Sequence, residues 1–515
     1  MYPGAHAAVT PDKPAVVMAD DGRTLTYGQL EERSVRLAHV LHAHGLRRGE
    51  AVALLAENGP IYHEAFWATK RSGLLLTALN HHLSLEELAY IVRDCGAQVL
   101  LVSAATPELA VIGRRLAESA PGVTLRLAVG GAVGFDDYER ALAGASPVPF
   151  EDQPAGGDML YSSGTTGHPK AIRPTLPERQ VDEPGDLMVD VFGRLYGFGP
   201  DAVYLSPAPL YHAAPLRFSG IVQATGGTVV VMPRFDPERA LELIAEHRVT
   251  HSQWVPTMFV RMLKLPEQVR AAADVSTLRY AIHAAAPCPV EVKQAMIDWW
   301  GPVLHEYYAA TEAAGVTIIG PEDWLTHPGS VGRAALGVVH VCDETTEEQE
   351  EVPVGETGLV YFERDVMPFE YHNDPEKTRQ AQHPRHDNWA TTGDIGRLDD
   401  EGFLYLTDRA AFMIISGGRN IYPQEVENVL TMHPKVLDVA VIGVPDDDLG
   451  EAVKAVVHPA DGVEPGPDLE RELIDHVRSR IAHYKAPATV DFSTDLPRTP
   501  TGKLVKRVLR DRYLT

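Results

Sequence analysis

The sequence predicts an α/β fold, with a large N-terminal domain of packed β-sheets and flanking helices, and a small α+β C-terminal domain. Three observations lead to this prediction. The chain of 515 residues is too long for one ordinary domain, its N-terminal part alternates short apolar segments with helical patterns, and the organisation restarts after residue 408. We therefore expect two domains, residues 1–408 and residues 409–515, each with its own core.

The alternation of strands and helices is clear in the N-terminal part. Residues 25–46 carry apolar side chains at helical spacing, and the apolar run 51–58 after them is typical of a short buried strand. A second helical pattern, residues 85–96, precedes the apolar segment QVLLVSA. The same rhythm recurs at residues 203–210, 226–233, 237–249 and 250–256. Strand, helix and strand in this order predict parallel sheets covered on both faces.

The C-terminal part has a different organisation. The segments MIISGG, PQEVENVLTMH, VLDVAVIGVP and EAVKAVVHP predict a compact strand–helix–strand–strand set, and residues 468–484 predict a helix after it. Residues 498–512 then carry six basic side chains against one acidic side chain. The acidic run 343–351, by contrast, is expected to be a solvated loop rather than a metal site.

Composition excludes several classes of partner. The formal net charge is −25, from 46 basic and 71 acidic residues, which argues against non-specific binding to nucleic acid or to an anionic membrane. No stretch approaches the ~18 apolar residues of a membrane span, and the N-terminus lacks the pattern of a signal peptide. Three distant cysteines, Cys95, Cys288 and Cys342, argue against a disulfide framework. We expect a soluble cytoplasmic protein with no nucleic-acid partner and no integral membrane contact.

The segment YSSGTTGHPK, residues 161–170, has the composition of a phosphate-binding loop. Gly164 and Gly167 let the backbone approach a ligand, and backbone N–H groups, hydroxyls and Lys170 can together surround an anion. A Walker A loop places its lysine directly after the second glycine, whereas here the lysine follows Gly167 by three residues. This spacing disfavours a P-loop kinase or ATPase. From these residues alone, the alternative interpretation is that the segment is a flexible surface loop without a ligand.

The loop resembles the phosphate loop of the adenylate-forming superfamily, which includes acyl- and aryl-CoA synthetases, luciferases and the adenylation domains of peptide synthetases. Five further segments match the family's motifs in order and spacing: LSPAPLYHAAP (205–215), HEYYAATE (305–312), TTGD (391–394), YLTDRAAFMIISGGRNIYPQEVE (405–427) and LPRTPTGKLVKR (496–507). The resemblance covers nearly the whole chain and is strongest to bacterial fatty-acyl-CoA and aryl-CoA ligases. It implies that the C-terminal domain is a mobile lid that rotates between two half-reactions.

The resemblance implies a first reaction in which a carboxylate attacks the α-phosphate of ATP and pyrophosphate leaves. Two anions must meet, so the site must neutralise charge, in part with Mg2+. By resemblance, Glu312 is the Mg2+ ligand and Thr311 bonds the α-phosphate. Lys503 matches the lysine of the adenylating step, which can bridge a carboxylate and a phosphate oxygen, and Lys170 is the loop lysine.

Contacts with the nucleotide are also implied by the resemblance. Tyr308 matches the aromatic residue that stacks on adenine, Asp394 the carboxylate that holds the ribose hydroxyls, and Arg409 a second ribose contact. The full set assigned to ATP or AMP is Ser162, Ser163, Gly164, Thr165, Thr166, Gly167, Lys170, Ala284, Ala285, Ala286, Glu306, Tyr307, Tyr308, Ala309, Thr311, Asp394, Arg409 and Lys503.

The acid pocket is assigned on similar grounds. His212 matches the position that borders the acid, and Trp254 is a candidate for the floor or gate of an acyl tunnel, although each has ordinary core packing as its alternative. Related fatty-acyl ligases often have glycine or asparagine where this chain has alanine, and the added methyl groups should narrow the pocket. The assigned residues are His212, Trp254, Ala310, Ala313, Ala314 and Gly315.

Three glycine and alanine positions concern the second half-reaction. Gly417 and Gly418 resemble the loop beside the pantetheine tunnel of CoA, and Ala411 stands where the family commonly has an Asp or Lys hinge residue. The basic tail could attract the phosphates of CoA, with solvated charges as the alternative. The histidine pairs 81–82 and 383/386 lack a third metal-type ligand at useful spacing and are expected to be non-functional.

The leading hypothesis is an ATP-dependent acid–CoA ligase that uses ATP, Mg2+ and CoA. A medium-chain fatty acid or an aryl or cinnamic-type acid is favoured. The alternative within the fold is adenylation with another acceptor, such as a diazotase that activates nitrite for an aryl amine. A nucleotide-binding protein without catalysis is the alternative of another class, and Lys503, Glu312 and Lys170 argue against it. We allow for a homodimer.

Overall fold

The computed structural model describes residues 2–162, 169–343, 346–409, 412–446, 448–498 and 504–513, without the side chains of Ser162 and Arg507. It divides into two compact units. The first contains Met1–Gln253, Ala272–Ala281 and Phe369–Thr378, and the second contains Trp254–Ala271, Ile282–Pro368 and Arg379–Thr515. The predicted α/β class is confirmed, whereas the predicted domain boundary between residues 408 and 409 stays a prediction.

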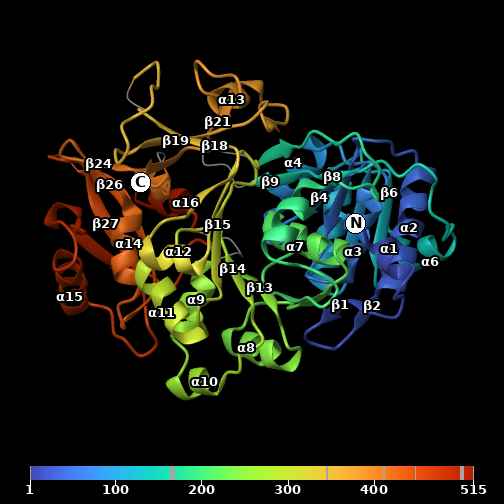
Figure 1. Ribbon diagram of the computed structural model, residues 1–515, viewed down its shortest axis with the longest axis horizontal. Coiled ribbons are helices and arrows are strands. Elements are labelled where there is room, and N and C mark those ends of the chain that lie inside the picture. The colour runs from blue at the N-terminus through green and yellow to red at the C-terminus, as the bar shows by residue number, and fades with distance from the viewer. Residues whose placement is uncertain are drawn as a thin grey trace. The chain divides into compact units, whose positions relative to one another are not determined.

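The first unit is built on two largely parallel sheets (Figure 1). One runs in the order β7 (Asp136–Asp137), β6 (Leu125–Val129), β5 (Val99–Ser103), β3 (Ala51–Leu55), β4 (Leu75–Leu79) and β8 (Gly157–Asp158), with every pair parallel. The other runs β2 (Thr24–Thr26), β1 (Pro14–Met18), β12 (Thr228–Val231), β11 (Val203–Ser206) and β13 (His251–Trp254), and only β2 is antiparallel. The uninterrupted apolar sequences of β3 and β4 are buried throughout, as expected for strands covered on both faces.

Helices cover these sheets as the alternation predicts. α3 (Pro60–Lys70) packs on β3 and β4, α7 (Ala213–Ala224) packs on β11 and β12, and the two helices pack on each other. They therefore form the layer between the sheets. The other helices of this unit are α1 (Pro3–Ala7), α2 (Tyr27–Ala43), α4 (Leu85–Asp94), α5 (Pro107–Ser119), α6 (Tyr138–Ala143) and α8 (Pro237–Glu246), with a π-helical turn at Val189–Gly193.

Two helices of the first unit begin where their sequences specify a cap. At α2, the Thr26 hydroxyl accepts the N–H of Gln29, and the Gln29 side chain accepts the N–H of Thr26 at 2.9 Å. Ser84 and Glu87 form the same reciprocal pair at α4. Each box satisfies N–H groups that the first helical turn would otherwise leave unpaired.

The second unit contains mainly antiparallel sheets. β15 (Leu304–Tyr308), β16 (Val316–Ile319) and β17 (Arg333–Leu336) form one set. β18 (Val338–Cys342), β19 (Gly358–Glu363), β22 (Asp394–Leu398) and β23 (Leu404–Arg409) form another, with β21 (Trp389–Ala390) paired to β19. The C-terminal sheet has the order β25 (Arg419–Ile421), β24 (Ile414–Ser416), β27 (Gly450–Pro459) and β26 (Val436–Asp446), with β28 (Thr489–Phe492) parallel to β27.

The helices of the second unit are α9 (Pro256–Leu263), α11 (Val290–Trp300), α12 (Pro321–Thr326), α14 (Pro423–Thr431), α15 (Pro467–Arg478) and α16 (Lys506–Asp511). α14 packs on β26 and on α15, and α15 packs on β28, so these two helices cover the C-terminal sheet. Four elements contain residues of both units: β13, β14 (Tyr280–His283), α10 (Glu267–Ala272) and α13 (Pro375–Gln380).

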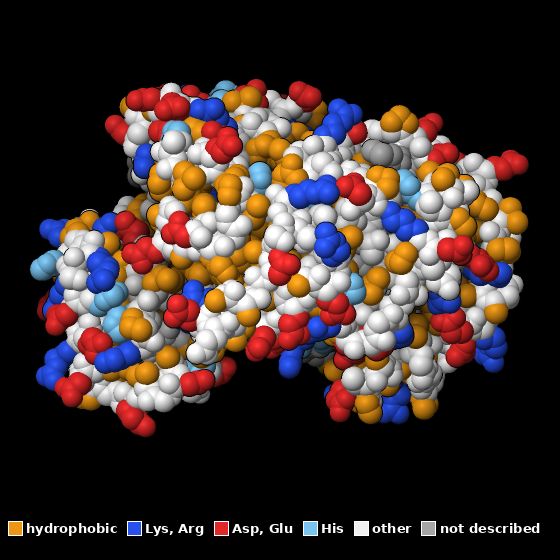
Figure 2. Space-filling model, turned by 60° about the horizontal axis from the view of Figure 1, so that its bottom comes forward, with side chains coloured by type: hydrophobic (Ala, Val, Ile, Leu, Met, Phe, Trp, Pro, Cys, Tyr) orange, Lys and Arg blue, Asp and Glu red, His pale blue; other side chains and the backbone are white. Residues whose placement is uncertain are grey.

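The surface carries charges of both signs. In the face shown in Figure 2, lysine and arginine side chains are interspersed with aspartate and glutamate side chains, without one continuous basic area. Among the described residues, no helix combines the length and the apolar character that a bilayer crossing requires.

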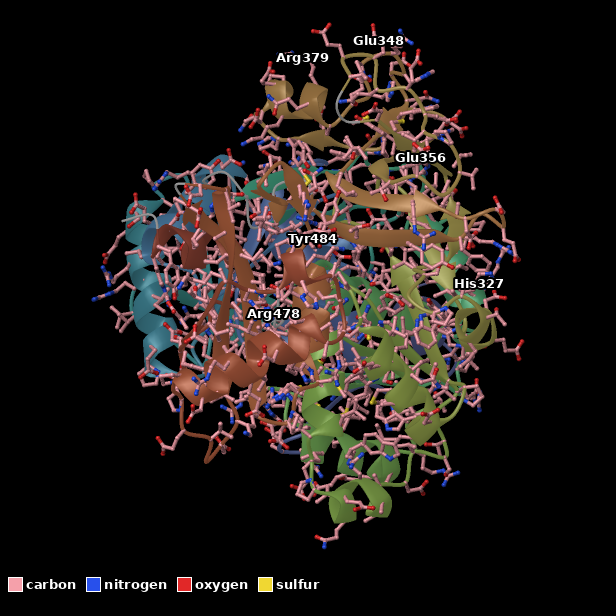
Figure 3. The ribbon with its side chains drawn as sticks, turned by 90° about the vertical axis from the view of Figure 1, so that its left-hand side faces the viewer. His327, Glu348, Glu356, Arg379, Arg478 and Tyr484 are labelled. Atoms are coloured by element: carbon pink, nitrogen blue, oxygen red, sulfur yellow. The ribbon has the colours of Figure 1, made fainter. Side chains whose placement is uncertain are left out.

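The last long helix is shorter than the sequence predicts. The helical pattern extends over residues 468–484, but α15 ends at Arg478, and the chain turns before Tyr484 (Figure 3). Beyond this end, Ile481 and Ala486 pack against the core of the C-terminal sheet. Tertiary packing of these two side chains therefore overrides the local helical pattern.

One close approach in the first unit requires glycine and is testable. A Cβ atom on Gly156 would lie 2.4 Å from the carbonyl oxygens of both Thr69 and Leu74. We expect Gly156→Ala to lower the free energy of unfolding by about 1–3 kcal/mol, because backbone atoms must move. Urea denaturation measures this loss. Gly122→Ala is the matched control, because a Cβ there meets no atom within 4 Å; an equal loss in both variants would contradict the packing argument.

Candidate active site

The glycine-rich segment stands between two antiparallel strands of the first unit. β9 (Leu160–Ser162) leads into it and β10 (Lys170–Arg173) leaves it, with Ser162 opposite Lys170. β20 (Glu370–Tyr371) pairs with the other edge of β10. The predicted strand before Ser162 is therefore present. Residues 163–168 lie outside the described residues, so the assignments of Ser163, Gly164, Thr165, Thr166 and Gly167 stay predictions.

The base of this hairpin is fixed by a carboxylate. The Tyr161 hydroxyl donates to Asp94 at 2.6 Å, and Asn373 donates to the second oxygen of Asp94 at 3.2 Å. Burial, followed by the nearby Cys95 and Asp94, raises the pKa of Tyr161, so its hydroxyl stays a donor. The Nζ of Lys170 lies 5.4 Å from the centre of the Tyr371 ring, within cation–π range. The two strand ends that flank the loop are thus held in place.

Three residues assigned to the nucleotide meet in the second unit. The Asp394 carboxylate accepts a hydrogen bond from the Tyr308 hydroxyl at 2.6 Å and lies 3.1 Å from the Nε of Arg409. The Thr392 hydroxyl donates to the same carboxylate at 2.8 Å. The arrangement follows from strand register, because Asp394 at the start of β22 pairs with Arg409 at the end of β23. Thr392 is a contact that the sequence reading missed.

The charges of this cluster support one another. Burial acts to lower the pKa of Arg409, but the neighbouring Asp394, Tyr308 and Glu312 together raise it. Burial and then Asp394 raise the pKa of Tyr308, so its hydroxyl stays protonated. Arg409 therefore stays a cation and Tyr308 a donor across the physiological pH range.

Glu312 belongs to the electrostatic surroundings of this cluster, since its charge acts on Arg409. Mg2+ in nucleotide sites is commonly held by one or two carboxylates together with the phosphates. A single carboxylate beside the Asp394 cluster fits this donor set. Within the described ranges, no group of three or more histidine, cysteine, aspartate or glutamate side chains could hold a metal on its own. The Mg2+ assignment of Glu312 stays a prediction.

The carboxylate of Glu306 is engaged by another side chain. The Nζ of Lys293, on α11, lies 2.6 Å from the Glu306 carboxylate, and both side chains are buried. The Nε2 of His283 lies 3.6 Å from the same oxygen. Burial lowers the pKa of His283, as does Lys293, so His283 is neutral and Lys293 is the counter-ion. The nucleotide contact predicted for Glu306 stays a prediction.

Two alanines in the predicted site have left-handed backbone conformations. Ala285 has a φ of 75° and Ala313 a φ of 53°, values that favour glycine. The Ala313 N–H donates to the carbonyl of Ala310 at 3.0 Å, which closes a turn around Thr311 and Glu312. Left-handed alanine costs about 1–2 kcal/mol, and such strain concentrates at functional sites.

Of the other predicted residues, Ala284, Tyr307 and Ala314 are buried, and Ala286 and Ala309 are half-buried.

Packing accounts for two of the residues assigned to the acid pocket. Trp254 is 1% exposed, and its ring lies 5.6 Å from that of Trp300 and 6.2 Å from that of Phe259. A Cβ on Gly315 would lie 1.9 Å from the Phe362 ring, so packing alone requires glycine there. The pocket assignments of both residues stay predictions. His212, in the first unit, is half-buried at the amino end of α7.

The glycines assigned to CoA are required by a turn. Gly417 and Gly418 have φ values of 57° and 74° and join β24 to β25, with Ser416 opposite Arg419. A two-residue hairpin turn with positive φ at both positions accounts for both glycines. Their role in CoA binding stays a prediction, and Ala411 and Lys503 lie outside the described residues.

The basic side chains near the C-terminus already have acidic partners. The described ion pairs are Lys485–Glu425, Arg498–Asp438, Lys506–Glu427, Arg510–Glu451 and Arg512–Asp495. They give no support to a free basic surface for the phosphates of CoA. Lys506 and Glu427 are both buried, and Glu427 accepts the N–H of Val441 at 2.7 Å, so this pair holds α16 and α14 to β26.

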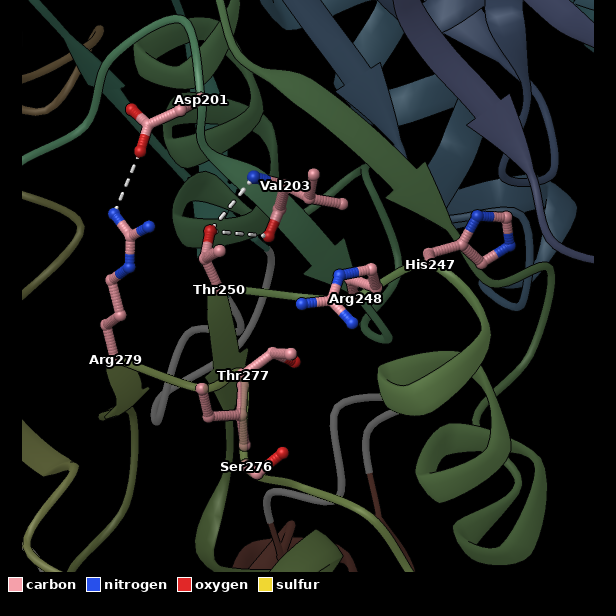
Figure 4. Close-up of a pocket in the computed structure, with 9 residues that line it drawn as sticks. Asp201, Val203, His247, Arg248, Thr250, Ser276, Thr277 and Arg279 are labelled. Atoms are coloured by element: carbon pink, nitrogen blue, oxygen red, sulfur yellow. Dashed lines mark hydrogen bonds and ion pairs between the residues drawn. The ribbon is translucent and has the colours of Figure 1, made fainter.

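A polar cavity of about 650 Å³ lies at the amino-terminal ends of β11 and β13 (Figure 4). Arg279 pairs with Asp201 at 2.9 Å, and the Thr250 hydroxyl donates to the Val203 carbonyl and accepts its N–H. Ligands of parallel α/β sheets bind at the opposite, carboxyl ends of the strands. None of the predicted site residues lines this cavity, so it is not part of the candidate site.

Comparisons with known proteins agree with the geometry. The family model described as AMP-binding enzyme matches residues 4–369, and the model of the AMP-binding enzyme C-terminal domain matches residues 425–503. The long-chain-fatty-acid–CoA ligase FadD13 of Mycobacterium tuberculosis is 35% identical over 523 residues, which cover 99% of this chain and 97% of that protein. Feruloyl-CoA synthase of an Amycolatopsis species is 35% identical over 517 residues, covering 99% and 98%. The solved structure of the amide bond synthetase McbA of Marinactinospora thermotolerans has a TM-score of 0.80 at 29% identity and covers 99% of both chains.

The buried Lys293–Glu306 pair makes a testable prediction about stability. Lys293→Met leaves Glu306 buried without its counter-ion, and we expect a loss of about 3–5 kcal/mol in the free energy of unfolding at pH 8. Burial already raises the pKa of Glu306 above 4.5, against the effect of Lys293, and loss of the lysine raises it further. The folded variant then binds more protons than the unfolded chain above pH 4.5, so its stability falls as the pH rises.

Urea denaturation at pH 5 and at pH 8 measures this dependence. The loss should be smaller at pH 5, where Glu306 can take a proton in the folded state. The control is Lys293→Met combined with Glu306→Gln, which removes both charges and should restore most of the stability. An equal loss in the single and the double variant would contradict the charge argument and leave only the packing of the lysine stem.

Proposed function

We propose a two-step reaction for this chain, which belongs to the family of AMP-binding enzymes. It first converts a carboxylic acid and ATP into an acyl-adenylate, and it then transfers the acyl group to CoA. Its relatives are AMP-forming acyl-CoA ligases and synthetases. The observation that supports the proposal most directly is the Asp394 carboxylate with Tyr308, Thr392 and Arg409 around it. A carboxylate with donors on both sides suits the two adjacent hydroxyls of a ribose.

In the adenylating step, an acid carboxylate attacks the α-phosphate of ATP, the bond to pyrophosphate breaks, and an acyl-phosphate bond forms. Attack of one anion on another requires charge neutralisation. Arg409 is a cation beside the ribose site, and Lys170 and Lys503 supply mobile positive charge to the phosphates and the carboxylate. Mg2+ held by Glu312 would supply further neutralisation when bound.

In the thioester-forming step, the thiol of CoA attacks the acyl carbon and AMP leaves. The proposal assigns Lys503 to the first step only, so residues 409–515 act as a lid that moves about Ala411 between the steps. Gly417 and Gly418 then flank the pantetheine arm. The reaction belongs in the cytoplasm, and a homodimer stays a prediction.

The acid is a medium-chain fatty acid or an aryl or cinnamic-type acid. The name of the relative FadD13 supports a fatty acid, although a long-chain one, the name of the medium-chain acyl-CoA ligase ACSF2 of Danio rerio supports the chain length, and feruloyl-CoA synthase supports the aryl class. The likeness to an amide bond synthetase favours one second candidate, an adenylating enzyme whose acceptor is an amine instead of CoA. Activation of nitrite for an aryl amine is a related form of this candidate.

A screen of pyrophosphate release tests the proposal. Fatty acids, aryl acids and nitrite are each supplied with ATP, with and without CoA, and then with an aryl amine in place of CoA. Release that depends on an organic acid, followed by thioester formation with CoA, is the expected result. Release that needs an amine and ignores CoA would establish the second candidate, and no release with any acid would overturn adenylation.

Lys503→Ala should separate the two half-reactions. We expect pyrophosphate release to fall on the order of 10²–10³-fold, because a charge aimed at the transition state is lost. Thioester formation from a supplied acyl-adenylate should continue. Lys435→Ala is the matched control, since Lys435 is an exposed lysine paired with Glu472 in the same part of the chain. Equal losses in both half-reactions would contradict the role given to Lys503.

Asp394→Asn should weaken binding of ATP. The amide keeps the shape but loses the charge that Arg409 faces and half of the acceptor capacity, so we expect the KM for ATP to rise about tenfold or more. Tyr308→Phe, which removes one hydrogen bond to Asp394 and keeps the ring, should raise this KM less. Steady-state pyrophosphate release at varied ATP measures both. A larger effect of Tyr308→Phe would show that the hydroxyl, and not the carboxylate, holds the ribose.

A further inference from the structure

We propose that an aromatic cluster of His81, His82, Tyr211 and His212 binds a hydroxyl group of the acid, so that the substrate is a hydroxylated carboxylic acid. This histidine–tyrosine cluster lies entirely within the first unit. The inference rests on the proposed function and names the substrate class of the same site.

The cluster joins the carboxyl ends of two sheets. His81 and His82 follow β4, which ends at Leu79, and Tyr211 and His212 follow β11, which ends at Ser206. The His81 ring lies 4.1 Å from that of His82 and 5.5 Å from that of Tyr211, which it meets at 87°. The rings of Tyr211 and His212 are 4.6 Å apart. Carboxyl ends of parallel strands are where α/β proteins bind ligands, and His212 matches the position that borders the acid.

Two buried polar atoms of this cluster have no partner. The Tyr211 side chain is 5% exposed, yet its hydroxyl has no hydrogen bond within the described part of the chain, and the same holds for the Nδ1 of His81. Leaving such an atom unpaired costs about 1–3 kcal/mol, and buried polar atoms are nearly always paired. The neighbouring Tyr62 shows the usual outcome, because its hydroxyl donates to the Ala56 carbonyl at 3.1 Å.

The protonation state of the cluster defines the missing partner. Burial, and then His82, lowers the pKa of His81 to about 4, although a hydrogen bond to the Ala56 backbone acts in the opposite direction. His81 is therefore neutral at pH 7. A neutral imidazole has one donor and one acceptor nitrogen, so the unpaired Nδ1 needs a partner that can donate or accept, and a hydroxyl group can do both.

Tyr211 supplies the complementary half of the site. Burial raises the pKa of Tyr211, so its hydroxyl stays protonated and can donate. A hydroxyl group both donates and accepts, and therefore matches the His81 and Tyr211 pair. A methyl group offers neither function, and a carboxylate offers no donor. An amide of the pantetheine arm of CoA offers the same pair of functions, so the experiment must separate these two sources.

The test measures ATP–pyrophosphate exchange in the absence of CoA, with the full-length chain. Matched acids differ by one hydroxyl: 4-hydroxycinnamate and cinnamate, 4-hydroxybenzoate and benzoate, and 3-hydroxydecanoate and decanoate. The wild-type chain should prefer the hydroxylated member of at least one pair by about tenfold or more in kcat/KM. Tyr211→Phe and His81→Phe should each raise the KM for that acid about 5–20-fold and leave its unsubstituted partner within about twofold.

Thermal unfolding distinguishes a ligand site from a structural role. Tyr211→Phe removes an unpaired hydroxyl, so its melting temperature should equal or exceed that of the wild-type chain. Tyr27→Phe is the matched control, because the buried Tyr27 hydroxyl donates to the Gly227 carbonyl at 2.7 Å. That variant should melt at a lower temperature and keep its KM for every acid. A lower melting temperature for Tyr211→Phe, with no change in KM, would overturn the inference.

The remaining outcomes are equally decisive. If the variants change the KM for CoA in the complete reaction but not the KM for the acid in exchange, the cluster binds the pantetheine arm and the substrate class is wrong. If the wild-type chain exchanges unsubstituted acids at least as well in every pair, the inference fails while the proposed function stands. If no acid supports exchange, both fail.

Discussion

The Asp394 carboxylate is the constraint on which the candidate nucleotide site depends. A buried carboxylate must be paired and hydrogen-bonded, because the desolvation of a free charge is too costly. Tyr308 and Thr392 satisfy one oxygen and Arg409 the other. The ends of β15, β22 and β23 are thereby fixed to one point. In the proposed complex, a ribose with two hydroxyls has to displace one of the present donors, because a carboxylate has roughly four acceptor positions. Binding is thus an exchange of hydrogen bonds within a preformed network.

β15 carries a second buried charge two residues before Tyr308. Glu306 is compensated by Lys293 from α11, with neutral His283 close to the same oxygen. The strand that ends in the nucleotide cluster is therefore held by an ion pair along its length as well as by Asp394 at its end. Removing one partner of a buried ion pair costs more stability than replacing both partners, because the remaining charge stays buried without a counter-ion. The Lys293–Glu306 pair therefore fixes α11 against β15. The motif HEYYAATE consequently combines a structural carboxylate with the predicted nucleotide contacts.

Much of the fold could be predicted from local sequence. The helices that begin at Thr26 and Ser84 have reciprocal caps, and β3 and β4 have apolar sequences without alternation, so local signals and tertiary structure agree. The end of α15 could not be predicted, because the packing of Ile481 decides it. Motif resemblance indicated Tyr308, Asp394 and Arg409 as a set, and the structure brings them together. It could not show that Glu306 is paired, because Lys293 lies outside the motif.

Two features that no motif reveals concern the same question, the identity of the acid. Ala313, a residue assigned to the acid pocket, keeps a left-handed conformation despite about 1–2 kcal/mol of strain, and Arg364 donates to the carbonyls of Ala313 and Ala314 at 3.3 Å. Methyl groups at such positions leave less room than glycine would. The unpaired hydroxyl of Tyr211 and the unpaired nitrogen of His81 add a polar requirement. This unmet hydrogen-bonding demand in the first unit is poorly suited to a purely apolar acid. In the proposed complex, an acid with a hydroxyl group would relieve the cost of the unpaired atoms.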